Sequence, residues 1–302
     1  MDTNENQDIA GKKYWDTTER NLQVVMQPFS PDGNRIGDFG KRIWHKAFDT
    51  ALAELAGTGK KLLELGCGGS AYLPYFFRHF GLQVYGMDYS ELGCELASRM
   101  CEVNGVPSQI ICADFLKPPP EMLGDFDVVV SFGVVEHFTD TQGTLSKFAN
   151  FLRPGGLMIT TVPNMGGLVG LAQSVLAHDV FEKHVILKRD FFRKAHEDAG
   201  LSIVQCEYLL FSGLGIVDIG VNAPLPKKLA LAALKKLNGL VWALESIIGP
   251  LPPNALSSPY LICVATKPVN AEHQGRADDS KGRVGSKDVV NDSTVDACIL
   301  PN

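Results

Sequence analysis

The chain has 302 residues, 45% of them hydrophobic and 21% charged, which is enough to bury a core in one large domain with insertions or in two small ones. With a formal charge of -6 and a pI near 5.7, the chain lacks the basic character of nucleic-acid-binding proteins. We therefore expect a small-molecule ligand and no nucleic acid. No stretch approaches the about 18 consecutive apolar residues that a membrane-spanning helix requires.

The cysteines and the N-terminus bear on the cellular compartment. The 7 cysteines occur singly, without CxxC pairs or regular spacing, and imply no metal. The first residues, MDTNENQDIAGKK, lack the apolar run of a signal peptide. We therefore expect a cytoplasmic protein with reduced thiols.

In chain order, the sequence begins with a polar segment, residues 1–12, that we expect to be disordered. Residues 13–57 carry enough aromatic side chains to pack as a helical extension. From residue 60 to 162, short apolar runs alternate with stretches of helical period, a pattern typical of a doubly wound, Rossmann-like α/β sheet. The predicted strands are 60–66, 83–88, 108–112, 126–131 and 155–162, and the predicted helices between them are 71–80, 90–105 and 141–152.

The second half of the chain adds a predicted helix at 188–200 and two predicted strands, 201–211 and 259–268. Residues 165–187 and 212–258 do not follow the alternation and are predicted insertions. One domain is therefore expected over residues 13–268. Residues 269–302 are polar, show little periodicity and are predicted to be a disordered tail.

Residues 223–250 in the second insertion are predicted to form an amphipathic helix with a locally basic face. Pro224 and Pro226 mark its start, and Gly249 marks its end. Such a helix is compatible with a lid over a ligand pocket, a homodimer contact, a peripheral membrane contact, or ordinary packing on the domain's own sheet. Its apolar positions recur at steps of three and four residues: Leu225, Leu229, Leu234, Leu237, Leu240, Val241, Leu244 and Ile248.

A glycine cluster lies between the first predicted strand and the following helix. Gly66, Gly68 and the residues after them satisfy G-x-G-x-x-A, the weaker form of the dinucleotide-binding pattern. Glycines there allow a sharp turn and a close approach of the backbone to a ligand, although a tight turn alone would also explain them. No Lys-Ser/Thr pair follows, so a phosphate-binding P-loop is not indicated.

Acidic and aromatic residues near the ends of the predicted strands narrow the choice of ligand. Asp88 ends the second strand, where a carboxylate can accept hydrogen bonds from both ribose hydroxyls of a nucleoside. Glu64, two residues before Gly66, would repel a pyrophosphate but suit an ammonium or sulfonium group. Asp114 and Phe115 follow the third strand, where a carboxylate can receive the amino group of adenine and a ring can lie against the base. The ligand is therefore expected to be cationic.

With the run LRPGG at residues 152–156, these motifs resemble the class I S-adenosylmethionine-dependent methyltransferases, particularly the small-molecule enzymes related to the ubiquinone and menaquinone methyltransferases. The resemblance implies S-adenosyl-L-methionine as the cofactor and a seven-stranded sheet of order 3-2-1-4-5-7-6 with the last strand antiparallel. It also implies that the turn at residues 64–68, including Cys67, wraps the methionine half of the cofactor, that Asp88 binds the ribose, and that Asp114 and Phe115 face adenine. Ser70 stands where the family commonly has a third glycine.

Two histidines are the candidates for catalysis. His137 follows the fourth strand, where a neutral imidazole could deprotonate an acceptor hydroxyl or amine, or could instead shape the cofactor pocket. His184 precedes a predicted helix and could act as a second acid or base, bind the acceptor, or be a surface or capping residue. Tyr14 resembles an aromatic residue that covers the cofactor in many relatives, although core packing would also explain it. Tyr89 and Phe132, beside the second and fourth strand ends, complete the cofactor-binding candidates.

The predicted function is transfer of a methyl group to a small-molecule acceptor, at oxygen in preference to nitrogen or sulfur, and a hydrophobic or lipid-linked acceptor is compatible with the second insertion. An NAD-dependent oxidoreductase is the alternative from another enzyme class. G-x-G-x-x-A and Asp88 support that alternative, whereas Glu64, Asp114 and LRPGG do not. A catalytically silent protein that keeps the cofactor site for structure is the third interpretation.

Overall fold

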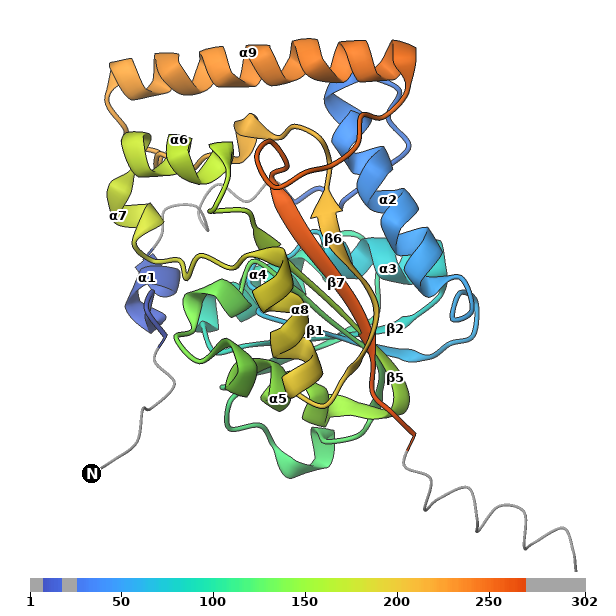
Figure 1. The fold of residues 1–302 in the computed structure, drawn as a ribbon. Helices are drawn as coiled ribbons and strands as arrows, with labels where there is room; N and C mark the ends of the chain where they lie inside the picture. Colours follow the sequence, from blue (N-terminus) through green and yellow to red (C-terminus); the bar gives the residue numbers. More distant parts are fainter. Residues whose placement is uncertain (1–7, 18–25, 270–302) are drawn as a thin grey trace, which may run out of the picture. The chain divides into compact units, whose positions relative to one another are not determined.

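Seven strands form one mixed sheet in the order β3-β2-β1-β4-β5-β7-β6, with β7 antiparallel to both of its neighbours (Figure 1). The structure is a computed structural model, and it describes residues 8–17 and 26–269. The sheet order confirms the α/β fold implied by the resemblance. The strands are β1 (Lys61–Leu65), β2 (Gln83–Asp88), β3 (Ser108–Cys112), β4 (Phe126–Phe132), β5 (Leu152–Pro163), β6 (Ser202–Leu209) and β7 (Tyr260–Thr266).

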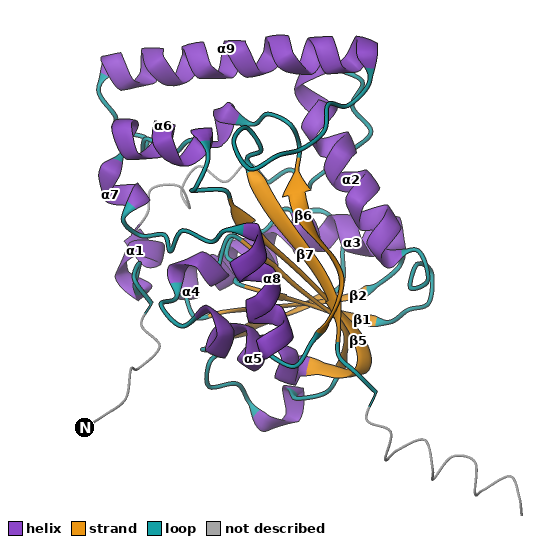
Figure 2. Ribbon diagram, in the orientation of Figure 1, coloured by secondary structure: helices purple, strands orange, loops and turns teal. Residues whose placement is uncertain are grey.

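Helices cover both faces of this sheet (Figure 2). Side chains of a strand alternate between its two faces, so Leu62 of β1 joins one buried cluster and Leu63 joins the other. The first cluster is completed by α2 (Phe39–Leu52), α3 (Tyr72–Phe80) and α4 (Glu91–Val103), and the second by α5 (Thr141–Phe151) and α8 (Arg189–Asp198). Because both faces are covered, the central strands are apolar on both sides, which explains why they read as continuous apolar runs.

Side-chain caps begin two of the helices that follow strands. The Ser90 hydroxyl accepts a hydrogen bond from the Gly93 N–H at 3.0 Å, so Ser90 is the N-cap of α4. Asp140 caps α5 in the same way, accepting from the Gly143 N–H at 2.8 Å. These caps fix where the chain leaves the sheet, and so fix the loops that border the ligand-binding edge.

The remaining helices lie outside this sandwich: α1 (Lys12–Thr17), α6 (Leu168–Leu176), α7 (His178–Phe181) and α9 (Leu225–Ile248). The predicted insertion helix is confirmed, since α9 starts after Pro224 and ends before Gly249. It is anchored by Trp242, whose indole N–H donates to the Ser212 carbonyl at 3.0 Å and whose ring packs against Phe39. Within residues 8–17 and 26–269, no helix is both long and apolar enough to cross a membrane.

The terminal segments predicted to be disordered are described in part. Residues 1–7 and 270–302 lie outside the described residues. Asp8 forms an isolated antiparallel bridge with Phe138, and the Ile9 N–H donates to the His137 carbonyl at 2.8 Å. Residues 8–12, which we expected to be disordered, therefore run beside the loop that follows β4.

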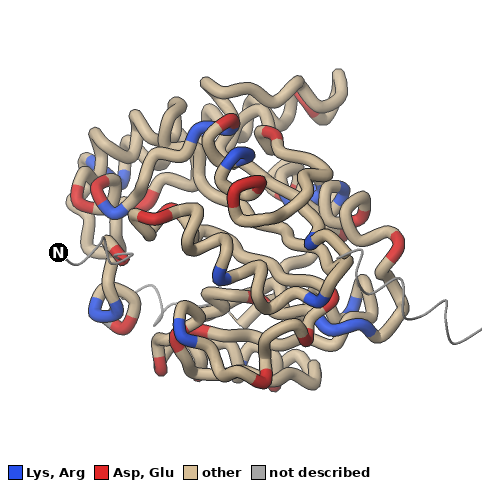
Figure 3. The backbone as a smooth tube through the Cα atoms, turned by 60° about the horizontal axis from the view of Figure 1, so that its bottom comes forward, with Lys and Arg blue, Asp and Glu red and all other residues tan. Residues whose placement is uncertain are grey.

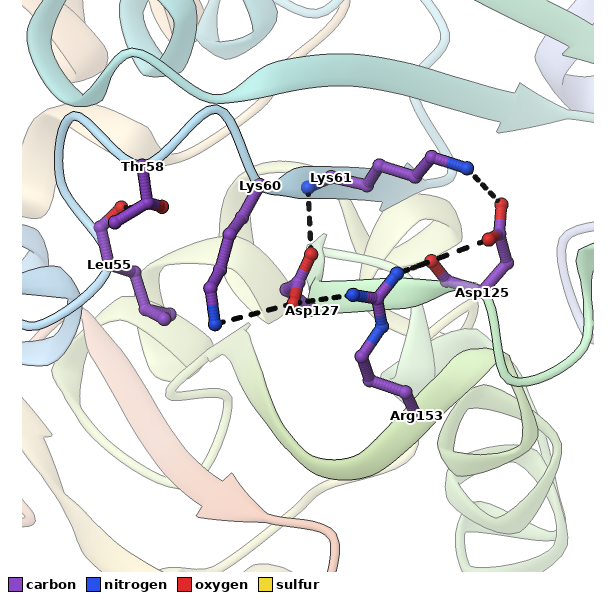
Figure 4. A network of polar contacts seen from close by, with 7 residues as sticks. All are labelled: Leu55, Thr58, Lys60, Lys61, Asp125, Asp127 and Arg153. Atoms are coloured by element: carbon purple, nitrogen blue, oxygen red, sulfur yellow. Dashed lines mark hydrogen bonds and ion pairs between the residues drawn. The ribbon is translucent and has the colours of Figure 1, made fainter. Parts of the chain in front are cut away.

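A polar network joins the strand starts at the edge of the sheet opposite the glycine cluster (Figure 4). The buried Asp127 carboxylate accepts hydrogen bonds from the Lys61 backbone N–H and from the Arg153 guanidinium, both at 2.9 Å. The more exposed Asp125 pairs with the Lys61 ammonium at 2.7 Å. Arg153 is the arginine of LRPGG, so this motif ties the start of β5 to the starts of β1 and β4.

Basic and acidic positions are interspersed along the described backbone in the view of Figure 3.

Candidate active site

A cavity of about 380 Å³ lies where the parallel strands β1, β2, β4 and β5 end. Ligands bind at this carboxyl edge in open α/β sheets, at the place where strand order reverses between β1 and β4. The cavity is lined by most of the residues proposed from sequence: Tyr14, Gly66, Gly68, Asp88, Tyr89, Phe115, Phe132, His137 and His184. Glu64, Cys67 and Asp114 are not among its lining residues.

The glycine turn has two positions that only glycine fits. Gly66 has φ +75°, and a Cβ there would meet the Val134 side chain at 2.3 Å. At Gly68 a Cβ would lie 2.9 Å from an Asp88 carboxylate oxygen, the same oxygen that accepts the Gly68 N–H at 2.9 Å. The glycines therefore let the turn close onto the end of β2, which leaves the space above it for a ligand.

Glu64 lies beneath this turn and does not line the cavity. Its carboxyl is buried and accepts a hydrogen bond from the Ser70 hydroxyl at 2.7 Å. Burial raises the pKa of Glu64 to about 8, so the carboxyl is neutral at pH 7 in the absence of a nearby cation. A negative charge was expected here from the sequence; in the structure Glu64 carries that charge only when a nearby cation offsets the cost of burial.

Cys67 is also beneath the turn, with its sulfur packed against Gly86 of β2. Burial raises the pKa of this thiol well above its usual range, which makes it a packing residue in the reduced form. Because the Cys67 side chain points into the core, only its backbone could make the predicted contact with the methionine half of the cofactor.

Asp88 links the glycine turn to α4. One carboxylate oxygen accepts the Gly68 N–H at 2.9 Å and the other accepts the Ser90 N–H at 2.8 Å. Burial raises the pKa of Asp88 above its ordinary value, while these hydrogen bonds oppose the rise. Each oxygen keeps a second acceptor position, and the residue lines the cavity, as the ribose role requires. The neighbouring Tyr89 hydroxyl donates to Asp8 at 2.5 Å.

Phe115 and Asp114 are the two residues predicted to face adenine, and of these only Phe115 lines the cavity. Phe115 is only 2% exposed, and its ring packs edge-on against Phe138 and Phe148 at centroid distances of 5.6 and 5.3 Å. Asp114 caps the turn after β3, where one carboxylate oxygen accepts the Leu116 N–H at 2.8 Å. This hydrogen bond gives Asp114 a structural role in the turn that does not require a ligand. Contact between Asp114 and adenine therefore stays a prediction.

Phe132 ends β4 between two spaces. Its ring contacts Tyr72 at a centroid distance of 4.5 Å and also lines the main cavity. Phe132 also lines a smaller cavity of about 180 Å³, together with Trp44 and Tyr260. Phe132 therefore borders both cavities.

The two candidate histidines come together although 47 positions separate them in the sequence. Their ring centroids are 4.7 Å apart, and both line the cavity. His137 Nδ1 lies 2.6 Å from the Lys183 carbonyl, and His184 Nδ1 lies 2.8 Å from the Val180 carbonyl. The first contact and a hydrogen bond from the Val185 N–H to the Glu136 carbonyl hold the two chain segments together.

The N-terminal helix α1 covers part of the same region. The Trp15 ring packs edge-on against His137 at 5.1 Å, and Tyr14 packs against Trp15 at 5.0 Å. Asp16 accepts a hydrogen bond from the Ser90 hydroxyl at 2.7 Å, which attaches α1 to the start of α4. Tyr14 therefore lies on the cavity wall, with its side chain engaged in aromatic packing at the same time.

Four lining residues with carboxylate or amide side chains were absent from the sequence-based candidates: Asp8, Glu136, Gln173 and Asp218. Asp8 was missed because the segment around it has no periodic signal. Glu136 is adjacent to His137 and could have been proposed with it. Gln173 and Asp218 pair through two hydrogen bonds of 2.7 and 2.9 Å between the Gln173 amide and the Asp218 backbone, across two insertions whose relation the sequence does not reveal.

Comparison with known proteins agrees with this geometry. Residues 63–160 match the family described as "Methyltransferase domain". A protein named ubiquinone biosynthesis O-methyltransferase from Rhizobium rhizogenes is 34% identical over 110 residues, which cover 35% of this chain and 42% of that protein. The chain thus matches less than half the length of this curated relative.

Solved structures extend the likeness to the whole fold. Geranyl diphosphate C-methyltransferase from Streptomyces coelicolor, solved with S-adenosyl-L-homocysteine, superposes with a TM-score of 0.52 at 16% identity, covering 85% of this chain and 96% of that one. A protein named as a [4+2]-cyclase superposes with a TM-score of 0.56 at 16% identity, covering 89% and 98%. Likeness at this level of identity shows the fold alone. Residues 63–160 therefore carry a methyltransferase domain, and the sheet that contains it has the strand order implied by the resemblance to the class I S-adenosylmethionine-dependent methyltransferases.

Proposed function

We propose that the protein transfers a methyl group from S-adenosyl-L-methionine to a hydroxyl oxygen of a small molecule. One observation carries the proposal: the cavity opens directly above the strand ends of the matched methyltransferase domain, bordered by the glycine turn and by Asp88. The name O-methyltransferase of the curated relatives supports oxygen as the acceptor atom.

The cofactor's groups find chemically matched partners around the cavity. Asp88 would accept hydrogen bonds from the ribose hydroxyls, and Phe115 would lie against adenine. The sulfonium and ammonium charges would favour the ionised form of Glu64, whose burial otherwise keeps it protonated. Binding would then be accompanied by release of the Glu64 proton.

The reaction itself needs position more than acid–base chemistry. The acceptor oxygen attacks the methyl carbon in line with the leaving sulfur, so an oxygen–carbon bond forms as the sulfur–carbon bond breaks and a neutral thioether remains. The acceptor hydroxyl also loses its proton, and we propose that His137 and His184 assist this loss, because both line the cavity close to each other. Trp15 covers His137 and would help to exclude water.

The acceptor end of the cavity combines apolar and polar groups. Met165, Val169 and Ile216 line it together with the paired Gln173 and Asp218. An acceptor with an apolar body and a hydrogen-bonding group suits these walls. A hydrophobic or lipid-linked acceptor is therefore proposed as the substrate class.

Turnover with methyl-labelled S-adenosyl-L-methionine and a panel of phenols, alcohols, amines and thiols tests the proposal. We expect label in an oxygen-methylated product with one S-adenosyl-L-homocysteine formed per methyl group, and mass spectrometry of the product distinguishes oxygen from nitrogen or sulfur. Cofactor binding without transfer to any acceptor would instead support a silent binding protein. Hydride transfer with NAD would support the oxidoreductase alternative.

The solvent-exposed side of α9 suggests where the protein would encounter a hydrophobic or lipid-linked acceptor. Asn238, Trp242 and Glu245 form the side of the helix that faces the protein, and the opposite side carries exposed apolar residues. A surface helix normally presents polar residues to water, so the pattern is reversed here. The exposed apolar residues are Leu225, Leu229, Leu237, Leu240, Leu244, Ile247 and Ile248.

We propose that this apolar side of α9 rests on a lipid surface. Lys227, Lys228, Lys235 and Lys236 lie on the same helix and would favour anionic headgroups. α6 adds exposed apolar residues, with Val175 at 72% exposure. A second copy of the chain is the competing occupant, in which case α9 would form a homodimer contact.

Flotation with phosphatidylserine-containing and neutral vesicles tests this use of α9. We expect the full chain to float with the anionic vesicles, and the double variant Leu240→Glu/Ile247→Glu to lose this binding. Val204→Glu is the matched control, because Val204 is 64% exposed but lies on β6. Unchanged flotation of the double variant would eliminate the membrane role. A dimer in solution that the double variant dissociates would assign the surface to self-association.

A further inference from the structure

Three side chains at the cavity could together hold a metal ion. Glu136, His137 and His184 each offer one ligand atom, and these atoms lie within 4.8 Å of one another. All three residues line the cavity. Two imidazoles and one carboxylate form a donor set found in zinc enzymes and in other divalent transition-metal sites.

The imidazoles are held in the tautomer that metal binding requires. The Nδ1 atoms of His137 and His184 lie 2.6 and 2.8 Å from the Lys183 and Val180 carbonyl oxygens, which can only accept. Each Nδ1 therefore carries a proton and donates, so that when a ring is neutral its lone pair is on Nε2. Metal-binding histidines commonly donate their other ring N–H to a backbone carbonyl in this way, which fixes the ring orientation.

The Glu136 carboxylate gives independent evidence that a ligand binds here. The Glu136 side chain is only 3% exposed, and its Oε1 lies 3.9 Å from His137 Nε2. Its Oε2 is buried and has no hydrogen-bond partner among the described residues. A buried oxygen of this kind is costly unless a ligand satisfies it, and Glu136 also borders the cavity.

The backbone prepares the same arrangement. The Val185 N–H donates to the Glu136 carbonyl at 2.7 Å, which joins the chain next to His184 to the loop after β4. Two ligands about 2.1 Å from one ion lie roughly 3.4 Å apart at the tetrahedral angle. Small side-chain rotations that bring the three ligand atoms closer together would therefore fill three of the four positions of a tetrahedral metal site.

We propose that Glu136, His137 and His184 bind one divalent transition-metal ion, of the zinc type, at the acceptor end of the cavity. Two imidazoles favour such an ion over Mg²⁺ or Ca²⁺, which take oxygen ligands. The remaining coordination position lies on the cavity side and suits an oxygen atom. As a consequence that rests on the proposed function, this oxygen is the acceptor hydroxyl, which the ion holds beside the methyl donor.

Cobalt(II) is the probe for the test, because it binds zinc-type sites and its visible spectrum reports the ligands. Untagged full-length protein is treated with chelator, dialysed and titrated with CoCl₂ in the absence of any cofactor or acceptor. We expect one equivalent to give visible bands of nitrogen and oxygen coordination, and ZnCl₂ to displace it. This readout does not depend on methyl transfer, so failure of the proposed activity would leave it interpretable.

Single variants assign the ligands. We expect His184→Ala and Glu136→Gln to weaken cobalt binding by at least the roughly 10–100-fold that loss of a supporting contact costs at metal sites. His178→Ala is the matched control and should bind normally, since His178 is 66% exposed and pairs with Glu182 on the outer side of α7. Circular dichroism checks that each variant is folded, and Glu136→Gln keeps the size of the side chain if His184→Ala does not fold.

Three results would overturn the proposal: no stoichiometric cobalt binding by the wild type, wild-type affinity in folded His184→Ala and Glu136→Gln, or an intense thiolate-to-cobalt band. The last would place the ion at cysteines. Any of them would return His137 to direct deprotonation of the acceptor, as the sequence first suggested.

Discussion

At the scale of single residues, the buried Glu64–Ser70 pair lies beneath the glycine turn that borders the cavity. The Ser70 hydroxyl donates to Glu64 and accepts the Tyr72 N–H at 3.0 Å, so it connects the strand, the turn and α3. The sequence shows Ser70 only as a departure from a glycine motif. Its partner is visible only in three dimensions, because six positions separate the two residues.

Ser70→Ala removes the donor to the buried Glu64 carboxyl and the acceptor for Tyr72. Loss of hydrogen bonds inside the protein leaves unsatisfied groups, so we expect the free energy of unfolding to fall by about 1–3 kcal/mol. Urea denaturation measures it. Ser246→Ala is the control, because the Ser246 hydroxyl only bonds the Trp242 carbonyl on the exposed part of α9, and its effect should stay within about 0.5 kcal/mol. Equal effects of the two substitutions would argue against the role assigned to Ser70.

Glu64 should also make stability depend on pH. Burial raises its folded pKa from 4.5 to about 8, so the folded protein holds a proton that the unfolded chain releases between these values. The stabilisation is fully present below about pH 4.5 and is lost as pH rises through 8. Glu64→Gln cannot titrate, so wild-type unfolding free energy should fall more steeply between pH 5 and 8, by up to about 1.4 kcal/mol per pH unit. Parallel curves for the two proteins would show that Glu64 is not buried as described.

At the scale of elements, β5 is where sequence and structure differ most. The strand was predicted to begin at residue 155, after a helix ending at residue 152, whereas it spans Leu152–Pro163. The Gly155 N–H donates to the Lys267 carbonyl at 2.8 Å, and the pairing with β4 shifts register between Phe126 and Val128. The turn is thus absorbed into the strand by partners far away in the sequence. The other strands and the helices α3, α4, α5, α8 and α9 were predicted because their apolar periodicity is local, whereas α6 and α7 in the first insertion were not predicted.

Asp127→Ala tests whether the network at the strand starts holds β1, β4 and β5 together. The buried carboxylate satisfies a backbone N–H and a guanidinium, so we expect a loss of about 2–3 kcal/mol in unfolding free energy, reduced from the buried-pair range because Arg153 is 41% exposed. Asp125→Ala, at a carboxylate 39% exposed, should cost less than about 1 kcal/mol. Thermal and urea unfolding measure both. Equal losses would contradict the central place of Asp127.

At the scale of the whole molecule, the proposed cofactor end and the proposed acceptor end of the cavity differ in how far the sequence predicts them. The cofactor end follows from strand ends and their motifs, and Gly66, Gly68, Asp88 and Phe115 meet at the cavity as expected. The acceptor end combines residues from α1, from the insertion with α6 and α7, and from the loop before α9. These segments come together only through tertiary packing. The spacing of residues in the sequence therefore does not predict the cluster of Glu136, His137 and His184.

Calorimetry of S-adenosyl-L-homocysteine and NAD binding tests the central claim most directly. We predict one site per chain for S-adenosyl-L-homocysteine and no measurable binding of NAD. Asp88→Ala should weaken the former by roughly 10–100-fold through loss of charge-assisted hydrogen bonds, while Asp125→Ala, at the opposite edge of the sheet, should bind as the wild type does. Preferential binding of NAD, or unchanged affinity of Asp88→Ala for S-adenosyl-L-homocysteine, would contradict the account.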